Sequence, residues 1–327
     1  MGVPFGRRRL VLGAGVVLAA PAVKAQAAWP AQTVKIVCGY PPGGSTDAFA
    51  RAYGDYAAQK LGQPFVVENK TGAASIIACE IVAKAAPDGY TLLFTNSTAL
   101  FQNQVTYKTL PYDPVRDFVP VALFPTGHLP MYVHKDVPAK DVKAFIAWAK
   151  NNKVSFATYG PGSVSHVTCA KLNELYGLKM EPVHYRGEGA MWPDVAAGTC
   201  HAAVGSYQSA LSAMQAGSVR PIAVPTMKRL KSKLPDIPTF YEQGLTHPTF
   251  LLEGMVGCLA PKGTPRAVVE KLSDVFVEAG KTERIQKILD LFGIDDAAQD
   301  WRALEAFMKD MGPQLIASVK ELGLTPQ

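Results

Sequence analysis

Short apolar runs alternate with stretches of helical periodicity along most of the chain. The apolar run 34–38 precedes a segment in which Phe49, Tyr53 and Tyr56 recur every three or four residues, which predicts a strand and then an amphipathic helix over 46–61. The same alternation predicts further strands at 65–68, 90–95, 131–134 and 154–158, around Val183, Ala203 and Ile222, and at 251–259. It predicts helices at 77–85 and 142–150, from Ser165, and after Pro265. Such alternation is typical of an α/β fold with parallel sheets covered by helices on both faces.

Two proline-rich passages interrupt this rhythm. Residues 107–130 and 235–248 suit connections that cross between domains. We therefore predict two doubly wound α/β domains with a ligand cleft between them, because ligands of such sheets bind at the carboxyl ends of the strands. The expected limits are 28–124 with 251–327 for a discontinuous domain 1, and 125–250 for domain 2.

The N-terminus has the pattern of an export signal. Arg7, Arg8 and Arg9 precede an uncharged apolar run over 10–20 that is too short to span a bilayer. Residues 1–27 are expected to be a cleavable signal peptide, of either the general or the twin-arginine type. The mature protein is therefore expected in the periplasm.

Charge and cysteine content exclude several classes of function. The formal net charge is +6, and the four basic residues of the signal segment account for most of it, which leaves +2. Nucleic-acid and membrane-surface binding gain no support from this balance. The six histidines form no metal-ligand pattern, and neither a metal nor another cofactor is expected. The five cysteines form no CxxC pair; a disulfide between Cys169 and Cys200 stays open, and the others are expected in the core.

The segment 40–47, Tyr-Pro-Pro-Gly-Gly-Ser-Thr-Asp, joins the first strand to the first helix. The unpaired backbone N–H groups of a helix start form a natural anion site, and glycines let a ligand approach the backbone. We expect Asp47 to orient the loop rather than to touch an anion. The alternative interpretation is an ordinary tight turn. The candidate ligand-binding residues here are Tyr40, Pro42, Gly43, Gly44, Ser45, Thr46 and Asp47.

A second loop of this kind, YGPGSVSH at 159–166, also follows a strand and opens a helix. Our central hypothesis is that two helix N-termini, one from each domain, face the same carboxylate. His166 either donates a hydrogen bond at the cleft wall or has a structural role. The candidates in this loop are Tyr159, Gly160, Gly162, Ser163, Ser165 and His166.

Other polar and aromatic residues near these loops complete the candidate site. Thr95, Asn96 and Ser97 end the third strand, where polar side chains meet a cleft. Arg186 either grips a second carboxylate or is a solvated loop residue. Ser206 is a further candidate. The aromatic residues near these loops suit an aromatic or elongated ligand, or simply pack: they are Tyr40, Tyr159, Trp192 and Tyr207.

An ordered set of segments carries a family resemblance. They are PPGGSTD at 41–47, LGQPFVVENKTGA at 61–73, AKAAPDGYTLLF at 83–94, LPYDPVRDFVPVALF at 110–124, YGPGSVSH at 159–166, HYRG at 184–187 and LAPKGTP at 259–265. In this set the chain resembles the tripartite tricarboxylate transporter substrate-binding proteins, or Bug receptors. The sequence departs from the family pattern at GAAS, residues 72–75, where GAGG is usual, and at Gly205, where an acidic residue is frequent.

The resemblance implies a type II periplasmic-binding fold, a small carboxylate ligand, and the membrane components of a tripartite tricarboxylate transporter as partners. A monomer without enzymatic activity is expected. One alternative is a periplasmic sensor that signals to a histidine kinase. The other is an exported hydrolase, which the sequence disfavours because Ser163 and Ser165 lie outside any GxSxG pattern, and because His166 and Cys169 have no identifiable orienting carboxylate.

Overall fold

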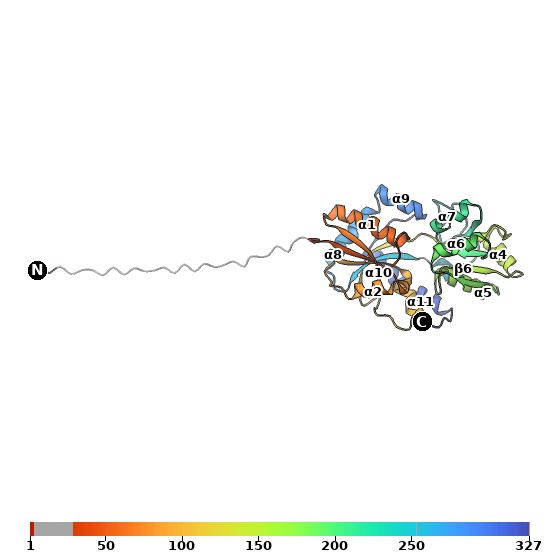
Figure 1. Cartoon of the computed structure of the whole chain (residues 1–327), viewed down its shortest axis with the longest axis horizontal. Coiled ribbons are helices and arrows are strands. Elements are labelled where there is room, and N and C mark those ends of the chain that lie inside the picture. The colour runs from red at the N-terminus through yellow and green to blue at the C-terminus, as the bar shows by residue number, and fades with distance from the viewer. Residues whose placement is uncertain (3–28, 253, 327) are drawn as a thin grey trace.

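The computed structural model describes residues 1–2, 29–252 and 254–326, and has two lobes, each built around one β-sheet (Figure 1). The expected signal peptide lies outside the described residues, apart from its first two positions. Within the described ranges, no helix is long and apolar enough to cross a bilayer.

The first sheet has six strands in the order β11-β4-β10-β3-β1-β2. They are β1 (Val34–Cys38), β2 (Phe65–Asn69), β3 (Thr91–Asn96), β4 (Phe118–Pro125), β10 (Met255–Pro261) and β11 (Gln299–Asp300). β1 is parallel to β2 and β3, whereas β10 is antiparallel to β3 and β4. The predicted parallel arrangement is therefore found for β1, β2 and β3 but not for β10, and the sheet is mixed. The physical reason is that β10 enters from the cleft, at the carboxyl end of β3, and runs back.

The second sheet has five strands in the order β7-β6-β8-β5-β9. They are β5 (Met131–His134), β6 (Ser155–Thr158), β7 (Glu181–His184), β8 (Ala202–Val204) and β9 (Val219–Ala223). β6 is parallel to β7 and β8, and β5 is antiparallel to β8 and β9. The strand that first enters this lobe from the cleft again breaks the parallel pattern.

The segment 118–125 was expected to belong to a connection, but it is an interior strand, β4. Its Phe124 stacks on Phe94, with 5.2 Å between ring centroids, and lies 4.5 Å from the Tyr53 ring. Pro120 is tolerated in this strand because the register with β10 shifts opposite it, at a β-bulge. The strand expected at 251–259 begins later, at Met255, since Leu251 ends the short 3₁₀ helix η3 (Pro248–Leu251).

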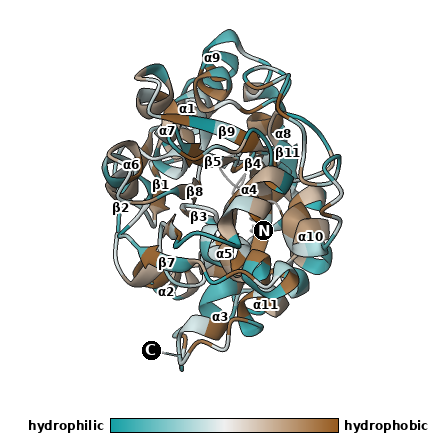
Figure 2. Ribbon diagram, turned by 90° about the vertical axis from the view of Figure 1, so that its right-hand side faces the viewer, coloured by the Kyte–Doolittle hydropathy of each residue, from teal (hydrophilic) through white to brown (hydrophobic). Residues whose placement is uncertain are grey.

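Helices cover both faces of each sheet. One core of the first lobe packs α1, α8 and α9 on its sheet, and a second core packs α2, α10 and α11 on the other face. In the second lobe α4 and α5 cover one face, and α6 and α7 the other. Figure 2 shows hydrophilic and hydrophobic residues alternating along outer helices such as α9.

The bounds in the first lobe are α1 (Ser45–Leu61), η1 (Ala73–Ser75), α2 (Ile76–Ala83), η2 (Thr98–Gln102), α3 (Asn103–Thr106), α8 (Arg266–Ala279), α9 (Glu283–Phe292), α10 (Trp301–Asp310) and α11 (Gly312–Lys320). Those in the second lobe are α4 (Val142–Ala149), α5 (Val164–Tyr176), α6 (Glu188–Ala196) and α7 (Tyr207–Gln215).

Two connections join the lobes, one between β4 and β5 and the other between η3 and β10. They run side by side, since a Cβ atom added at Gly254 would lie 3.1 Å from Thr126 Oγ1. The C-terminal segment adds a third link, because the buried Lys171 Nζ of α5 lies 2.6 Å from Glu321 Oε2.

Candidate functional site

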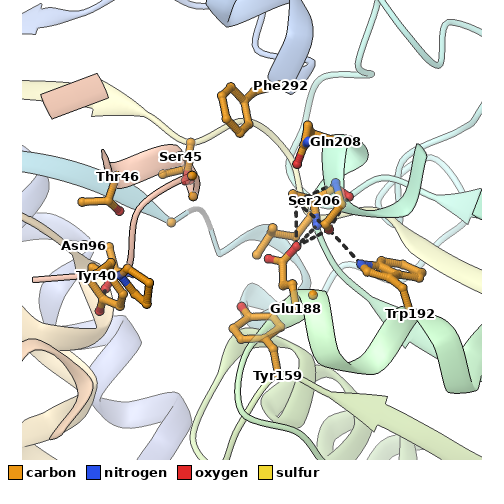
Figure 3. A pocket seen from close by; sticks show the side chains of 18 of the residues that line it. Tyr40, Ser45, Thr46, Asn96, Tyr159, Glu188, Trp192, Ser206, Gln208 and Phe292 are labelled. Carbon is orange, nitrogen blue, oxygen red and sulfur yellow. Dashed lines mark hydrogen bonds between the residues drawn. The ribbon is translucent and has the colours of Figure 1, made fainter. Parts of the chain in front are cut away.

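A cavity of about 970 Å³ lies between the two lobes. The first lobe contributes the β1–α1 loop and the end of β3, and the second contributes Tyr159 together with parts of α6 and α7 (Figure 3). Thr126 and Gly254, one from each connection between the lobes, also line it. The cavity therefore lies where a hinge motion of the lobes would change its shape.

The β1–α1 loop presents an uncapped helix N-terminus to this cavity. Gly43 has φ of +92°, a conformation that favours glycine, and Gly44 is the N-cap of α1 with no side chain capping the helix. Gly43, Gly44, Ser45 and Thr46 all line the cavity, as does Pro42. Backbone N–H groups at the start of α1 are thus available to an anion.

Asp47 does not line the cavity, but its carboxylate accepts hydrogen bonds that stabilise the β1–α1 loop. Its Oδ2 accepts hydrogen bonds from Gly43 N and Arg51 Nε, both at 3.0 Å, and its Oδ1 accepts one from Asn69 Nδ2 at 2.8 Å. Burial opposes ionisation of the Asp47 carboxyl, but these hydrogen bonds outweigh it and lower its pKa. The ionised carboxylate therefore ties the turn to α1 and β2.

The end of β3 contributes an amide to the cavity wall. Asn96 Oδ1 accepts hydrogen bonds from Tyr40 Oη at 2.6 Å and from Thr98 N at 3.0 Å. This arrangement leaves the Asn96 Nδ2 group without an acceptor in the described part of the chain. Tyr40 and Ser97 also line the cavity, whereas Thr95 is fully buried and bonds to Ser75 Oγ at 2.8 Å.

Most polar groups of the second loop, residues 159–166, form hydrogen bonds within the loop itself. Ser163 Oγ lies 2.6 Å from Gly160 O and 2.9 Å from Ser165 Oγ, and it caps His166 N. Gly162 N donates to His166 Nδ1 at 3.1 Å. Only Tyr159 of the candidate residues in this loop lines the cavity.

The packing around Gly162 explains why this loop is withdrawn. A Cβ atom there would lie 2.8 Å from Thr106 Cγ2, so the turn faces the first lobe rather than the cavity. The N-terminus of α5 is capped by its own serine, whereas the start of α7, at Ser206, does reach the cavity. The pairing of α1 with α5 around one carboxylate stays a prediction.

Of the remaining candidate residues, some line the cavity and others do not. Ser206 and Trp192 line the cavity, whereas Arg186 is exposed and Tyr207 is not among the lining residues. Sequence reasoning missed Glu188, whose carboxylate lines the cavity on the second lobe and bonds to Ser206. Its signal was a glutamate at the first position of a helix, directly after the glycine of HYRG. Sequence reasoning also missed Phe292.

The two departures from the family pattern have structural counterparts. In the GAAS turn Ala73, Ala74 and Ser75 all have positive φ, where a side chain is unfavourable. At Gly205 an added Cβ atom would lie 2.8 Å from Trp192 Cζ2 and 3.4 Å from Glu188 Oε2. Glu188 therefore occupies the space next to the position where an acidic side chain was expected.

Nucleophilic and metal chemistry find little support in the described residues. Burial raises the pKa of the Cys169 thiol to about 12, and burial with the neighbouring His184 lowers the pKa of His166 to about 4. All five cysteines are free and buried, so no Cys169–Cys200 disulfide forms. Within the described ranges, no group of three His, Cys, Asp or Glu residues could hold a metal ion.

Two α/β lobes joined by paired connections, with one cleft lined by backbone N–H groups and hydroxyls, define a solute-binding receptor. The chain matches the model of the tripartite tricarboxylate transporter family receptor over residues 49–324, and it belongs to that family. The resemblance inferred from the sequence is confirmed.

Similar proteins agree with this assignment. The UPF0065 protein in the tcbD-tcbE intergenic region of Pseudomonas sp. (strain P51) is 35% identical over 298 residues, which cover 90% of this chain and 88% of that protein. The R. palustris protein Rpa4515, solved with adipate, has a TM-score of 0.81 at 26% identity, covering 91% and 100% of the two chains. The periplasmic binding protein BugD has a TM-score of 0.74 at 29% identity, with the same coverages.

Proposed function

We propose that this protein is an extracytoplasmic receptor that binds a small carboxylate and delivers it to the membrane components of a tripartite tricarboxylate transporter. Membership of the receptor family supports the transport role. The adipate in the similar Rpa4515 structure supports a carboxylate as ligand. Export by a cleavable signal over 1–27, a periplasmic location and a monomeric state are parts of this proposal, as are the domain limits 28–124 with 251–327, and 125–250.

The observation that carries the proposal is the uncapped N-terminus of α1 on a cavity shared by both lobes. A carboxylate placed there accepts hydrogen bonds from backbone N–H groups, and the helix dipole favours its negative charge. The hydroxyls of Ser45 and Thr46 and the amide of Asn96 lie on the same wall. These donors recognise a carboxylate without requiring a cationic side chain.

Binding at this position would also drive closure of the receptor. The cavity wall on the second lobe carries Tyr159, Ser206 and Gln208, so a ligand held on α1 faces polar groups of both lobes, and contacts to both would favour the closed form. The closed form is the one that a membrane partner would recognise.

A thermal-shift screen of the purified mature protein tests the proposal. Carboxylates should raise the melting temperature, since a ligand that binds only the folded form stabilises it. The panel contains dicarboxylates, monocarboxylates and amino acids, with inorganic phosphate and neutral sugars as comparison. A shift with phosphate or sugars and with no carboxylate would refute the proposal.

A further inference from the structure

The cavity between the lobes has an unusual charge composition for an anion-binding site. Among the described residues that line it, none is lysine, arginine or histidine, and Glu188 is the only one with a charged side chain. Glu188 lies on the wall of the second lobe, opposite the start of α1 (Figure 3). A ligand that spans the cavity therefore meets hydrogen-bond donors at one end and a carboxylate at the other.

Hydrogen bonds fix the Glu188 carboxylate in place. Its Oε2 accepts from Ser206 N at 2.9 Å, from Ser206 Oγ at 2.6 Å and from Ser209 Oγ. Trp192 Nε1 in turn donates to Ser209 Oγ at 2.8 Å. Glu188 thus places a negative charge beside the N-terminus of α7, where it would repel a ligand carboxylate.

The other carboxylate oxygen stays available. Glu188 Oε1 accepts no hydrogen bond within the described ranges, although the side chain is only partly exposed. The aromatic rings of Tyr159 and Trp192 line the same wall. A carboxylate flanked by aromatic rings is a suitable site for a cationic nitrogen, which gains an ion pair and a cation–π contact together. A second ligand carboxylate would instead meet like charge without a cation to offset it.

We propose that the ligand is a zwitterionic carboxylate, whose carboxylate binds at α1 and whose protonated amine binds Glu188 Oε1. This inference rests on the proposed function, because it takes the α1 end as the carboxylate site. It makes Glu188 the residue that discriminates aminocarboxylates from dicarboxylates.

The test compares matched ligand pairs by isothermal titration calorimetry. The probes are 4-aminobutyrate, 5-aminopentanoate and 6-aminohexanoate against succinate, glutarate and adipate, which have the same chain lengths. The wild-type protein should bind its best aminocarboxylate at least tenfold more tightly than the dicarboxylate of equal length, because one charge-assisted hydrogen bond is gained and one repulsion avoided. Glu188→Gln should weaken aminocarboxylate binding at least tenfold and leave dicarboxylate binding unchanged or stronger.

The control is Glu181→Gln, the same change on an exposed residue of β7 that does not line the cavity. It should leave the selectivity unchanged. If Glu188 only caps α7, Glu188→Gln will lower the melting temperature without altering the ratio of the two affinities, which overturns the inference. Dicarboxylates that bind the wild type as tightly as aminocarboxylates, or a lack of binding by every aminocarboxylate, overturn it too. The proposed function falls only if no carboxylate of any kind binds.

Discussion

A carboxylate built into the start of α1 would compete directly with the ligand. Gly44 accommodates the substitution Gly44→Asp, because its φ of −78° and ψ of 169° are extended and an added Cβ atom would meet only Pro41 O, at 4.0 Å. The new side chain would cap N–H groups of α1 that are free in the wild type. Aspartate in place of glycine at an N-cap stabilises a helix by a few tenths of a kcal/mol. The variant should therefore fold at least as well as the wild type.

Binding should change in the opposite direction. Two carboxylates ~4 Å apart near a protein surface repel by ~4 kcal/mol, and by ~1 kcal/mol if water fully screens them. Loss of a charge-assisted hydrogen bond to the ligand adds ~1.5–3 kcal/mol. Since each 1.4 kcal/mol is tenfold in affinity, we expect carboxylate binding to weaken at least about fiftyfold. The diagnostic result is a stable protein that has lost its ligand.

The assay is thermal unfolding together with calorimetric titration, using whichever carboxylate gives the largest shift with the wild type. Thr282→Asp is the matched control, since Thr282 is the N-cap of α9, has similar dihedral angles (φ −78°, ψ 146°) and does not line the cavity. It should keep wild-type affinity. Wild-type affinity in Gly44→Asp would refute the assignment of the start of α1 as the carboxylate site.

Two further predictions concern stability. Phe124→Ala should lower the free energy of unfolding by about 3–5 kcal/mol, because Phe124 is 1% exposed and contacts aromatic residues from three segments. The control Val115→Ala, at a residue that is 73% exposed, should change it by less than about 0.5 kcal/mol. Urea denaturation that gave similar values for both variants would contradict the assignment of Phe124 to the core. Burial and the neighbouring His184 lower the pKa of His166 to about 4, whereas a histidine in an unfolded chain has a pKa of ~6.5. Between these two pH values the unfolded state binds more protons than the folded state. The free energy of unfolding should therefore fall as the pH drops from 6.5 towards 4. His166→Gln should reduce this fall in denaturation curves measured across the range, and an equal slope in both proteins would contradict it.

Local sequence signals located most of the elements. The periodicity over 46–61 corresponds to α1, and the strands expected at 131–134 and 154–158 correspond to β5 and β6. The local signals failed at 118–124, because prolines such as Pro120 predicted a connection there and the segment is a strand. A proline is accepted in that interior strand because β4 bulges next to Pro120, where its register with β10, a strand more than a hundred residues later, shifts.

The chain alone determined the uncapped turn between β1 and α1, because a Pro-Gly-Gly sequence between a strand and a helix sets its own backbone geometry within a few residues. The second wall of the cavity was decided by the tertiary structure. The turn at Gly162 packs against Thr106 and the C-terminal segment rather than facing the cleft. Glu188 is held in the cleft wall by a hydrogen bond from Ser206, 18 residues later in the chain. A turn depends on neighbours along the chain, whereas a cleft wall depends on which segments pack across it, and no local pattern records that packing.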